Sequence, residues 1–321
     1  STMPENLSGD KKLRIIAFRA QPHLQASPLA RTAMLWSALG HDVEIVAVTN
    51  GDIGHTRMQG PELAARRLAE VQEVAKVFGT TARVLDIRDG ELMPTLENRR
   101  TITRLIRQWR ADIVISHRPN DYHPDHRYTG VLVQDSAFMV TVPFFCPETP
   151  CLSYLSSNPV FLFLSDNFQQ PRPFRADIVV AIDTVLEKKL DALLKLESVF
   201  VENTCIGPYP KDEAERAAFG KAARGRLKDW FACVADRYRD KLVEYYGEEE
   251  GRQVRYAEAF EICEYGRQPT AVELGTLFPF LPGDRQQKEG QGVEARGTQE
   301  GPATTRPILA LWGASGTDRT P

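Results

Sequence analysis

The 321-residue sequence lacks several features that would place it in a particular class of protein. It has no apolar run long enough to cross a bilayer and no charged-then-apolar leader, so we expect no membrane association. The formal net charge is only −3, with no basic stripe, which argues against a nucleic-acid partner. Five cysteines without Cys-x-x-Cys spacing favour reduced thiols in a cytoplasmic protein. The first loop has no Gly-x-Gly-x-x-Gly motif, which argues against a nucleotide-binding protein.

What the sequence does contain is a regular alternation of strand and helix patterns. Short runs rich in β-branched residues predict buried strands over residues 13–18, 43–49, 83–87, 112–116, 160–164 and 177–182. Helical patterns lie over residues 32–39, 61–78, 96–109, 125–139, 184–200 and 212–246. This alternation predicts an α/β fold, a mainly parallel sheet with helices on both faces.

The composition changes at the two ends of the chain. Residues 1–12 are polar, and we expect them to be flexible. From about residue 281 the chain is rich in Gly, Gln, Glu, Thr and Pro and loses its apolar periodicity, which predicts a disordered tail over 281–321. One α/β domain is therefore expected over residues 13–280.

In open parallel sheets, ligands bind at the carboxyl ends of the strands. The predicted strands place three loops there, over residues 19–31, 50–60 and 117–126. Five of the six histidines fall in these loops: His23, His55, His117, His123 and His126. His41 follows a predicted helix and is expected at the surface.

His123-Pro124-Asp125-His126 spaces two imidazoles three residues apart across the start of a helix. One imidazole could bind a metal while the other donates to an oxyanion, and Asp125 could cap the helix or orient an imidazole. A capped helix start with surface histidines is the alternative interpretation.

The run His117–His126, preceded by 111–115, resembles the downstream motif of the LmbE/PIG-L family of zinc-dependent N-deacetylases. Three further segments resemble that family over about residues 13–280: Thr49-Asn50-Gly51-Asp52, Arg67-Leu68-Ala69-Glu70 and Asp89-Gly90. The resemblance implies a Rossmann-like fold, a zinc cofactor, and hydrolysis of an N-acetyl group on an amino sugar or its conjugate.

Carried over position by position, the resemblance implies that His126 binds zinc. The resemblance also implies that His123 stabilises the tetrahedral intermediate. Asp125, which could orient an imidazole, is a further candidate catalytic residue. The implied contacts to a small polar substrate are Asn50, Arg67, Asp89 and Tyr122.

The first metal motif of the family, Ala-His-Pro-Asp-Asp, is altered in this chain. Gln21 stands at the place of the first zinc ligand, His23 at that of the general base and Leu24 at that of the second ligand. An amide oxygen is a poor zinc donor and a leucine has none. The sequence therefore predicts little or no family activity. The mismatch is confined to residues 19–31, as a replaced block or two compensating frame shifts would produce.

Three alternatives remain open from the sequence. The chain is a zinc-dependent deacetylase, or a metal-free pseudoenzyme that binds a sugar or serves as a subunit of an assembly, including a homo-oligomer. A shifted metal site of His23, His123 and His126, with Asp52 or Asp121 as base, would restore hydrolysis.

Overall fold

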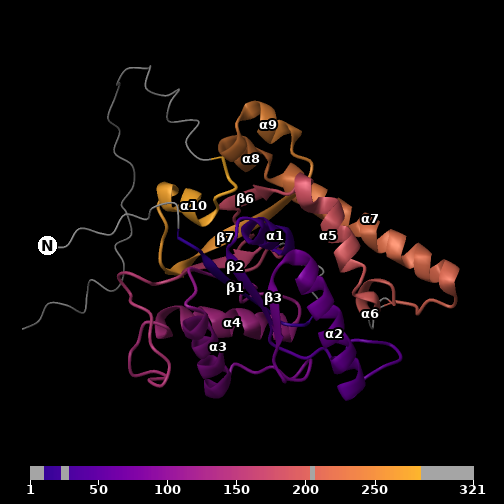
Figure 1. The fold of residues 1–321 in the computed structure, drawn as a ribbon, viewed down its shortest axis with the longest axis horizontal. Helices are drawn as coiled ribbons and strands as arrows, with labels where there is room; N and C mark the ends of the chain where they lie inside the picture. Colours follow the sequence, from indigo (N-terminus) through magenta and orange to yellow (C-terminus); the bar gives the residue numbers. More distant parts are fainter. Residues whose placement is uncertain (1–10, 23–28, 203–206, 283–321) are drawn as a thin grey trace, which may run out of the picture. The chain divides into compact units, whose positions relative to one another are not determined.

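The structure, a computed structural model, describes residues 11–22, 29–202 and 207–282 (Figure 1). The strands are β1 (Arg14–Arg19), β2 (Asp42–Ala47), β3 (Thr81–Val84), β4 (Ile113–Ser116), β5 (Val160–Leu164), β6 (Ile178–Ala181) and β7 (Ala257–Gly266). The helices are α1 (Ala30–Ala38), α2 (Gly60–Phe78), α3 (Leu96–Trp109), α4 (Pro124–Met139), α5 (Leu186–Leu193), α6 (Glu197–Phe200), α7 (Glu213–Arg237), α8 (Arg239–Tyr246), α9 (Glu248–Gln253) and α10 (Ala271–Leu277), with a 3-10 turn, η2 (Asp183–Val185). The expected flexible N-terminus and tail lie outside the described residues, except for 11–12 and 281–282.

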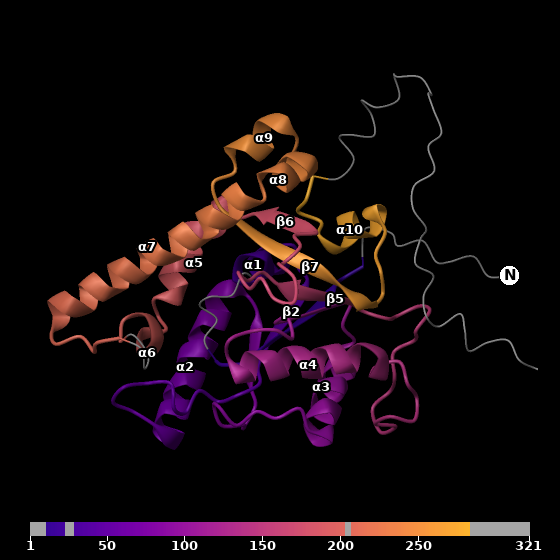
Figure 2. The same ribbon diagram turned by 180° about the vertical axis from the view of Figure 1, so that it is seen from behind.

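The strands form one sheet in the order β3-β2-β1-β4-β5-β7-β6. Strands β1 to β5 pair in parallel, which confirms the expected mainly parallel sheet. Strand β7 was not predicted, and it runs antiparallel between β5 and β6 (Figure 2). Its Glu258 and Glu261 are fully buried, and their charges are met by Lys189 and Arg172 from distant parts of the chain.

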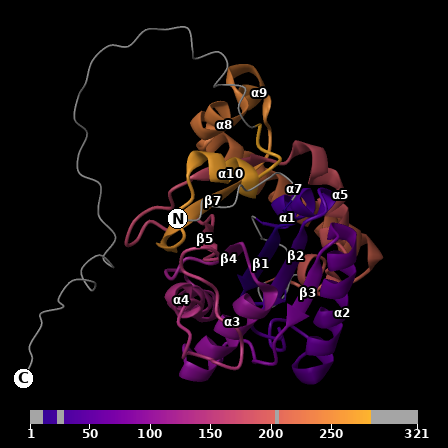
Figure 3. The ribbon, with the colours of Figure 1, turned by 60° about the vertical axis from the view of Figure 1, so that its left-hand side comes forward.

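Helices cover both faces of the sheet, as predicted (Figure 3). Along β1, Ile15 and Ala17 pack in a core shared with α1, α2 and α5. Ile16 and Phe18 point the other way, into a core shared with α3 and α4. This alternation follows from the two-residue period of a strand, so β1 is apolar on both sides.

Several predicted boundaries need correction. The helix expected over 184–200 is divided into η2, α5 and α6, and the one expected over 212–246 is interrupted at Tyr238 (φ −114°, ψ 33°). Strand β3 begins two residues before the predicted run. Helix α2 ends at Phe78, as predicted from the glycine that follows it. Gly79 adopts a left-handed conformation (φ 68°) that other residues reach only with strain.

Among the described helices, none combines the length and the apolarity needed to cross a membrane. Cys146, Cys151, Cys233 and Cys263 are free thiols.

Candidate functional site

The loops that follow β1, β2 and β4 meet at one edge of the sheet. The amide of Thr49 donates to the carbonyl of Ala20 at 2.7 Å, and the amide of Ala20 donates to Nε2 of His117 at 3.3 Å. The carboxyl ends of parallel strands therefore converge as the predicted topology requires. Of the three predicted loops, residues 23–28, which include His23, lie outside the described residues.

The side chain of Gln21 bridges two residues at the start of α4. Its Oε1 lies 2.8 Å from Nε2 of His126, and its Nε2 donates to Oδ2 of Asp125 at 3.2 Å. A carboxylate only accepts hydrogen bonds, so the NH₂ group must face Asp125 and the amide oxygen must face His126. Gln21 is 6% exposed and Asp125 fully buried, so water competes little with this bridge.

The second ring nitrogen of His126 also faces an acceptor. Its Nδ1 lies 3.1 Å from Oδ1 of Asp121. An oxygen atom therefore lies within hydrogen-bonding distance of each ring nitrogen of His126, and the Gln21 amide oxygen occupies the space beside Nε2.

His123 is the N-cap of α4, so capping by Asp125, one of its two suggested roles, is wrong. Nδ1 of His123 accepts from the Asp125 amide at 3.1 Å, which places the ring proton on Nε2. Burial lowers the pKa of His123, and the neighbouring His126 lowers it further. Nε2 of His123 lies 3.4 Å from the Gln21 amide nitrogen. A neutral imidazole with its proton on Nε2 is a hydrogen-bond donor suited to a carbonyl oxygen or an oxyanion.

Asp125 itself ties α4 to the loop after β3. Its Oδ2 accepts from the Gly90 amide at 2.7 Å as well as from Gln21. Its Oδ1 is buried without a hydrogen-bond partner among the described residues. Asp125 therefore holds Gln21 and Gly90 in place rather than capping the helix.

His117, Asp121 and His126 form a group of potential metal ligands, with one donor atom of each within 4.8 Å of the others. However, the rings of His117 and His126 are stacked, with centroids 4.3 Å apart and planes inclined by only 12°. Imidazole lone pairs lie in the ring plane, and an ion about 2 Å from each nitrogen must lie near both planes. Two nearly parallel, stacked planes share no such point, so these rings cannot bind one ion as they stand.

Asp89 and Arg67 lie in a second polar group beneath the β2 loop. Asp89 accepts hydrogen bonds from the Thr49 hydroxyl and from the Gly51 amide at 3.2 Å, and burial raises its pKa. Arg67 is 1% exposed and donates to the carbonyls of Gly51 (3.0 Å) and Gly54 (2.5 Å). Both side chains therefore fix the shape of this loop.

The other predicted positions differ in their surroundings. Tyr122 is 74% exposed, with its ring edge-on to His123 and His126. The Asn50 side chain contacts Asp86 (3.4 Å) and the Asp52 amide (3.2 Å), as a turn residue does. Their roles as substrate contacts stay predictions.

Two side chains considered from the sequence have partners outside the histidine cluster. His55 contacts Glu202 at 2.8 Å, and Asp52 pairs with Arg88 at 2.8 Å. Asp52 is therefore engaged with a cation and is poorly placed as a base.

Comparison with known proteins identifies the scaffold. The family model described as PIG-L: GlcNAc-PI de-N-acetylase matches residues 27–137. The diacetylchitobiose deacetylase of Thermococcus kodakarensis is 30% identical over 196 residues, which cover 59% of this chain and 71% of that protein. The chain belongs to the PIG-L family. The family match begins after Gln21, so it leaves out the altered first motif.

Solved structures share the PIG-L fold more widely. The N,N'-diacetylchitobiose deacetylase from Pyrococcus horikoshii aligns with a TM-score of 0.58 and 24% identity, over 81% of this chain and 87% of that one. The 4-carboxy-2-hydroxymuconate hydratase GalB of Pseudomonas putida aligns with a TM-score of 0.58 and 16% identity, over 81% and 98%. The fold therefore carries a hydratase as well as a deacetylase, and the reaction must be argued from the site.

The zinc implied by the PIG-L resemblance does not fit the described residues. A catalytic zinc needs three protein ligands and an open position. Gln21 offers only an amide oxygen, and that oxygen is hydrogen-bonded to the one predicted imidazole ligand, His126. The neighbouring His117 stacks on His126 instead of converging with it.

The loop after β5 also borders the site and was missed from the sequence. Arg118, 5% exposed, pairs with both carboxylate oxygens of Asp166 at 2.8 and 2.6 Å. Phe168 in that loop lies 6.3 Å from the ring of Tyr122. Because the predicted strand 160–164 also ends at this edge, its loop could have been included on topology alone.

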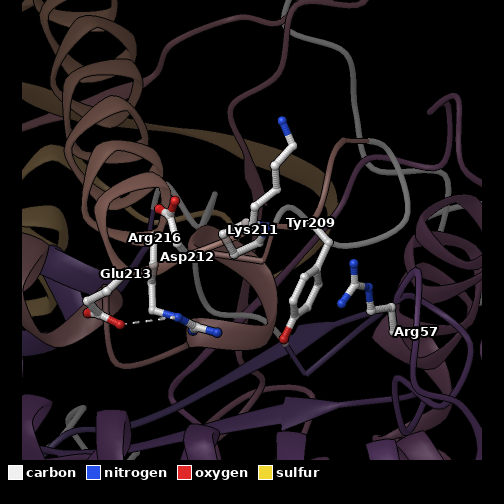
Figure 4. A pocket seen from close by; sticks show the side chains of 7 residues that line it. Arg57, Tyr209, Lys211, Asp212, Glu213 and Arg216 are labelled. Carbon is white, nitrogen blue, oxygen red and sulfur yellow. Dashed lines mark ion pairs between the residues drawn. The ribbon is translucent and has the colours of Figure 1, made fainter.

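A polar cavity of about 490 Å³ lies between the β2–α2 loop and the start of α7 (Figure 4). It is lined by Arg57, Tyr209, Pro210, Lys211, Asp212, Glu213 and Arg216. The Arg57 guanidinium lies 3.9 Å from the Tyr209 ring centre, and Arg216 pairs with Glu202 at 3.3 Å. None of the predicted site residues lines this cavity.

Proposed function

We propose that this chain binds an N-acetylated amino sugar or its conjugate on a PIG-L deacetylase fold, with little or no deacetylase activity of its own. The observation that carries the proposal is the Gln21 carboxamide, which joins His126 to Asp125. Those contacts occupy the groups that the family resemblance assigns to metal binding. This is the metal-free alternative expected from the sequence.

Loss of hydrolysis follows from chemistry. Amide hydrolysis at neutral pH requires an activated water and a polarised carbonyl, and in this family both are implied to come from zinc. The described residues offer no substitute for the metal-bound water. Asp125 is fully buried and already accepts from Gly90 and Gln21, so it is poorly placed to take a proton from water.

Binding of an acetamido group needs less than hydrolysis. The Nε2–H of His123 is a neutral donor that suits the carbonyl oxygen of an N-acetyl group. The exposed Tyr122 ring offers an apolar face, which sugar rings pack against through their C–H groups. A relative that is a diacetylchitobiose deacetylase supports an N-acetylated disaccharide as the first ligand to try.

Calorimetry with N,N'-diacetylchitobiose and with its fully deacetylated form tests the proposal, alongside a colorimetric assay for released amine. We expect binding of the acetylated sugar only, weakened in Tyr122→Ala, without release of amine. Tyr265→Ala removes a similarly exposed ring (48%) on β7 and is the matched control. Metal-stimulated release of amine would instead support the hydrolase, and absence of binding by N,N'-diacetylchitobiose would refute the binding proposal.

We also infer a reducing, cytoplasmic location from the unpatterned cysteines, four of which are free thiols in the structure. Labelling of thiols in freshly lysed cells would test it, with fully reactive Cys151 and Cys233 as the expected result.

A further inference from the structure

Three buried cations lie on the side of the sheet that α5 covers, and Arg19 lies close enough to Lys189 to lower its pKa. Arg19 is 7% exposed, and Arg31 and Lys189 are completely buried. The guanidinium carbon of Arg31 lies 3.6 Å from the centre of the Phe231 ring, and Nζ of Lys189 lies 4.5 Å from the same ring. We refer to Arg19, Arg31 and Lys189 as the buried cation cluster.

One buried carboxylate, Glu258 of β7, accompanies these cations. It receives Lys189 at 3.3 Å and hydrogen bonds from the Thr32 amide (2.9 Å), the Thr32 hydroxyl (2.7 Å) and the Arg31 amide (3.3 Å). Its oxygens are therefore taken up by other donors, and the Arg31 guanidinium does not reach them within hydrogen-bonding distance.

Other acidic groups act on the cluster from farther away. Asp121 raises the pKa of Arg19, but burial has the larger effect and lowers that pKa to about 10. Asp183 and Glu187 raise the pKa of Arg31, but both side chains are exposed and bound to other groups. When Lys189 is protonated, the cluster with Glu258 holds three positive charges and one negative charge inside the fold.

Several donors of the cluster lack acceptors. Nε, Nη1 and Nη2 of Arg31 and Nε of Arg19 are buried with no hydrogen-bond partner in the part of the chain that the structure describes. Burial lowers the pKa of Lys189 to about 7, and Arg31 and Arg19 both contribute to that decrease. Buried donors of this kind are costly unless an acceptor meets them.

We propose that the buried cation cluster binds a small inorganic oxyanion of the phosphate or sulfate type. A guanidinium presents its N–H groups as a planar fork that matches two oxygens of such an anion. The two guanidinium groups would supply the donors, and the charge of the ion would offset the excess positive charge of the cluster. The proposal uses none of the residues assigned to the proposed sugar site and does not depend on it.

The proposal makes the stability of the protein depend on oxyanion concentration. A ligand that binds only the folded state raises the unfolding temperature as its concentration exceeds the dissociation constant, and the rise follows a saturation curve. For a domain of this size we expect a shift of about 4 °C or more at a hundredfold excess over that constant. General salting-out by phosphate would instead grow linearly and without saturation.

The experiment compares thermal unfolding in inorganic phosphate with chloride at equal ionic strength, for the full chain and three variants. We expect saturation at millimolar phosphate in the wild type, loss of the effect in Arg31→Met and Arg19→Met, and retention in Arg252→Met. Arg252 is a largely exposed arginine on α9, paired with Glu248, and is the matched control. Equilibrium dialysis with radiolabelled phosphate should give one bound ion per wild-type chain.

Equal responses in all four proteins, or no bound ion in dialysis, would overturn the proposal. Either result would mean that the two arginines are misplaced charges that the fold tolerates. If one arginine variant fails to fold, dialysis of the other variant still decides the question.

Discussion

Replacement of Arg31 by methionine is expected to stabilise the fold in buffer free of oxyanions. Arg31 is completely buried, its guanidinium nitrogens have no partner among the described residues, and Lys189 already meets the charge of Glu258. Methionine is unbranched and can occupy much of the same space beside Phe231. The substitution removes one of the excess cations and leaves the Lys189–Glu258 pair intact.

The size of the effect follows from two opposing contributions. A buried charge without a partner costs about 3–5 kcal/mol. The contact of the guanidinium with Phe231, at 3.6 Å, returns at most about 2 kcal/mol. The difference predicts that Arg31→Met raises the free energy of unfolding by about 1–3 kcal/mol.

Urea unfolding, followed by circular dichroism in chloride buffer, measures this difference. The companion variant Glu258→Gln should have the opposite effect, a loss of about 3–5 kcal/mol, because it leaves the cations without their buried counter-charge. A lower midpoint for Arg31→Met at unchanged m-value would show that Arg31 is paired in solution and would refute the reasoning.

Three further outcomes are expected. Because the pKa of Lys189 is lowered to about 7 in the fold, the unfolded chain holds more protons than the folded chain above that pH. The free energy of unfolding should therefore rise from pH 7 toward pH 9, by at most about 1.4 kcal/mol per pH unit, and less steeply in Arg31→Met. A flat profile in urea titrations would contradict this. Gly51→Ala should lower the unfolding temperature more than Gly40→Ala, since both have positive φ but only at Gly51 would a Cβ lie 2.7 Å from two side chains; equal losses would argue against that packing. Tyr122→Ala should leave the unfolding temperature unchanged, because the side chain is 74% exposed, and a fall of several degrees would show that the ring is packed.

The parallel part of the sheet was predictable because its strands are apolar on both faces. Strands β1, β2, β4 and β5 are nearly free of charged residues in their interiors, and their order follows from short crossover connections. The edge at which His117, His123 and His126 gather follows from the same argument. Seven of the nine predicted site positions lie in the three loops assigned to that edge, and only Arg67 and Asp89 do not.

Strand β7 could not be predicted because its burial depends on partners distant in sequence. Glu258 and Glu261 read as surface residues until Lys189 and Arg172 are placed beside them. The bridge from Gln21 to Asp125 and His126 was likewise hidden, since it depends on side-chain orientation across 104 and 105 positions. Sequence identified the loss of metal donors, whereas the structure shows which contacts replace them.

Metal content tests the central claim most directly. After dialysis against micromolar zinc and removal of unbound metal, mass spectrometry of the elements should find far less than one zinc per wild-type chain. The variant Gln21→His, His23→Asp, Leu24→Asp, which restores the family's donors, should bind close to one. Near-stoichiometric zinc in the wild-type chain would contradict the account, because it would mean that the Gln21 bridge gives way to a metal site.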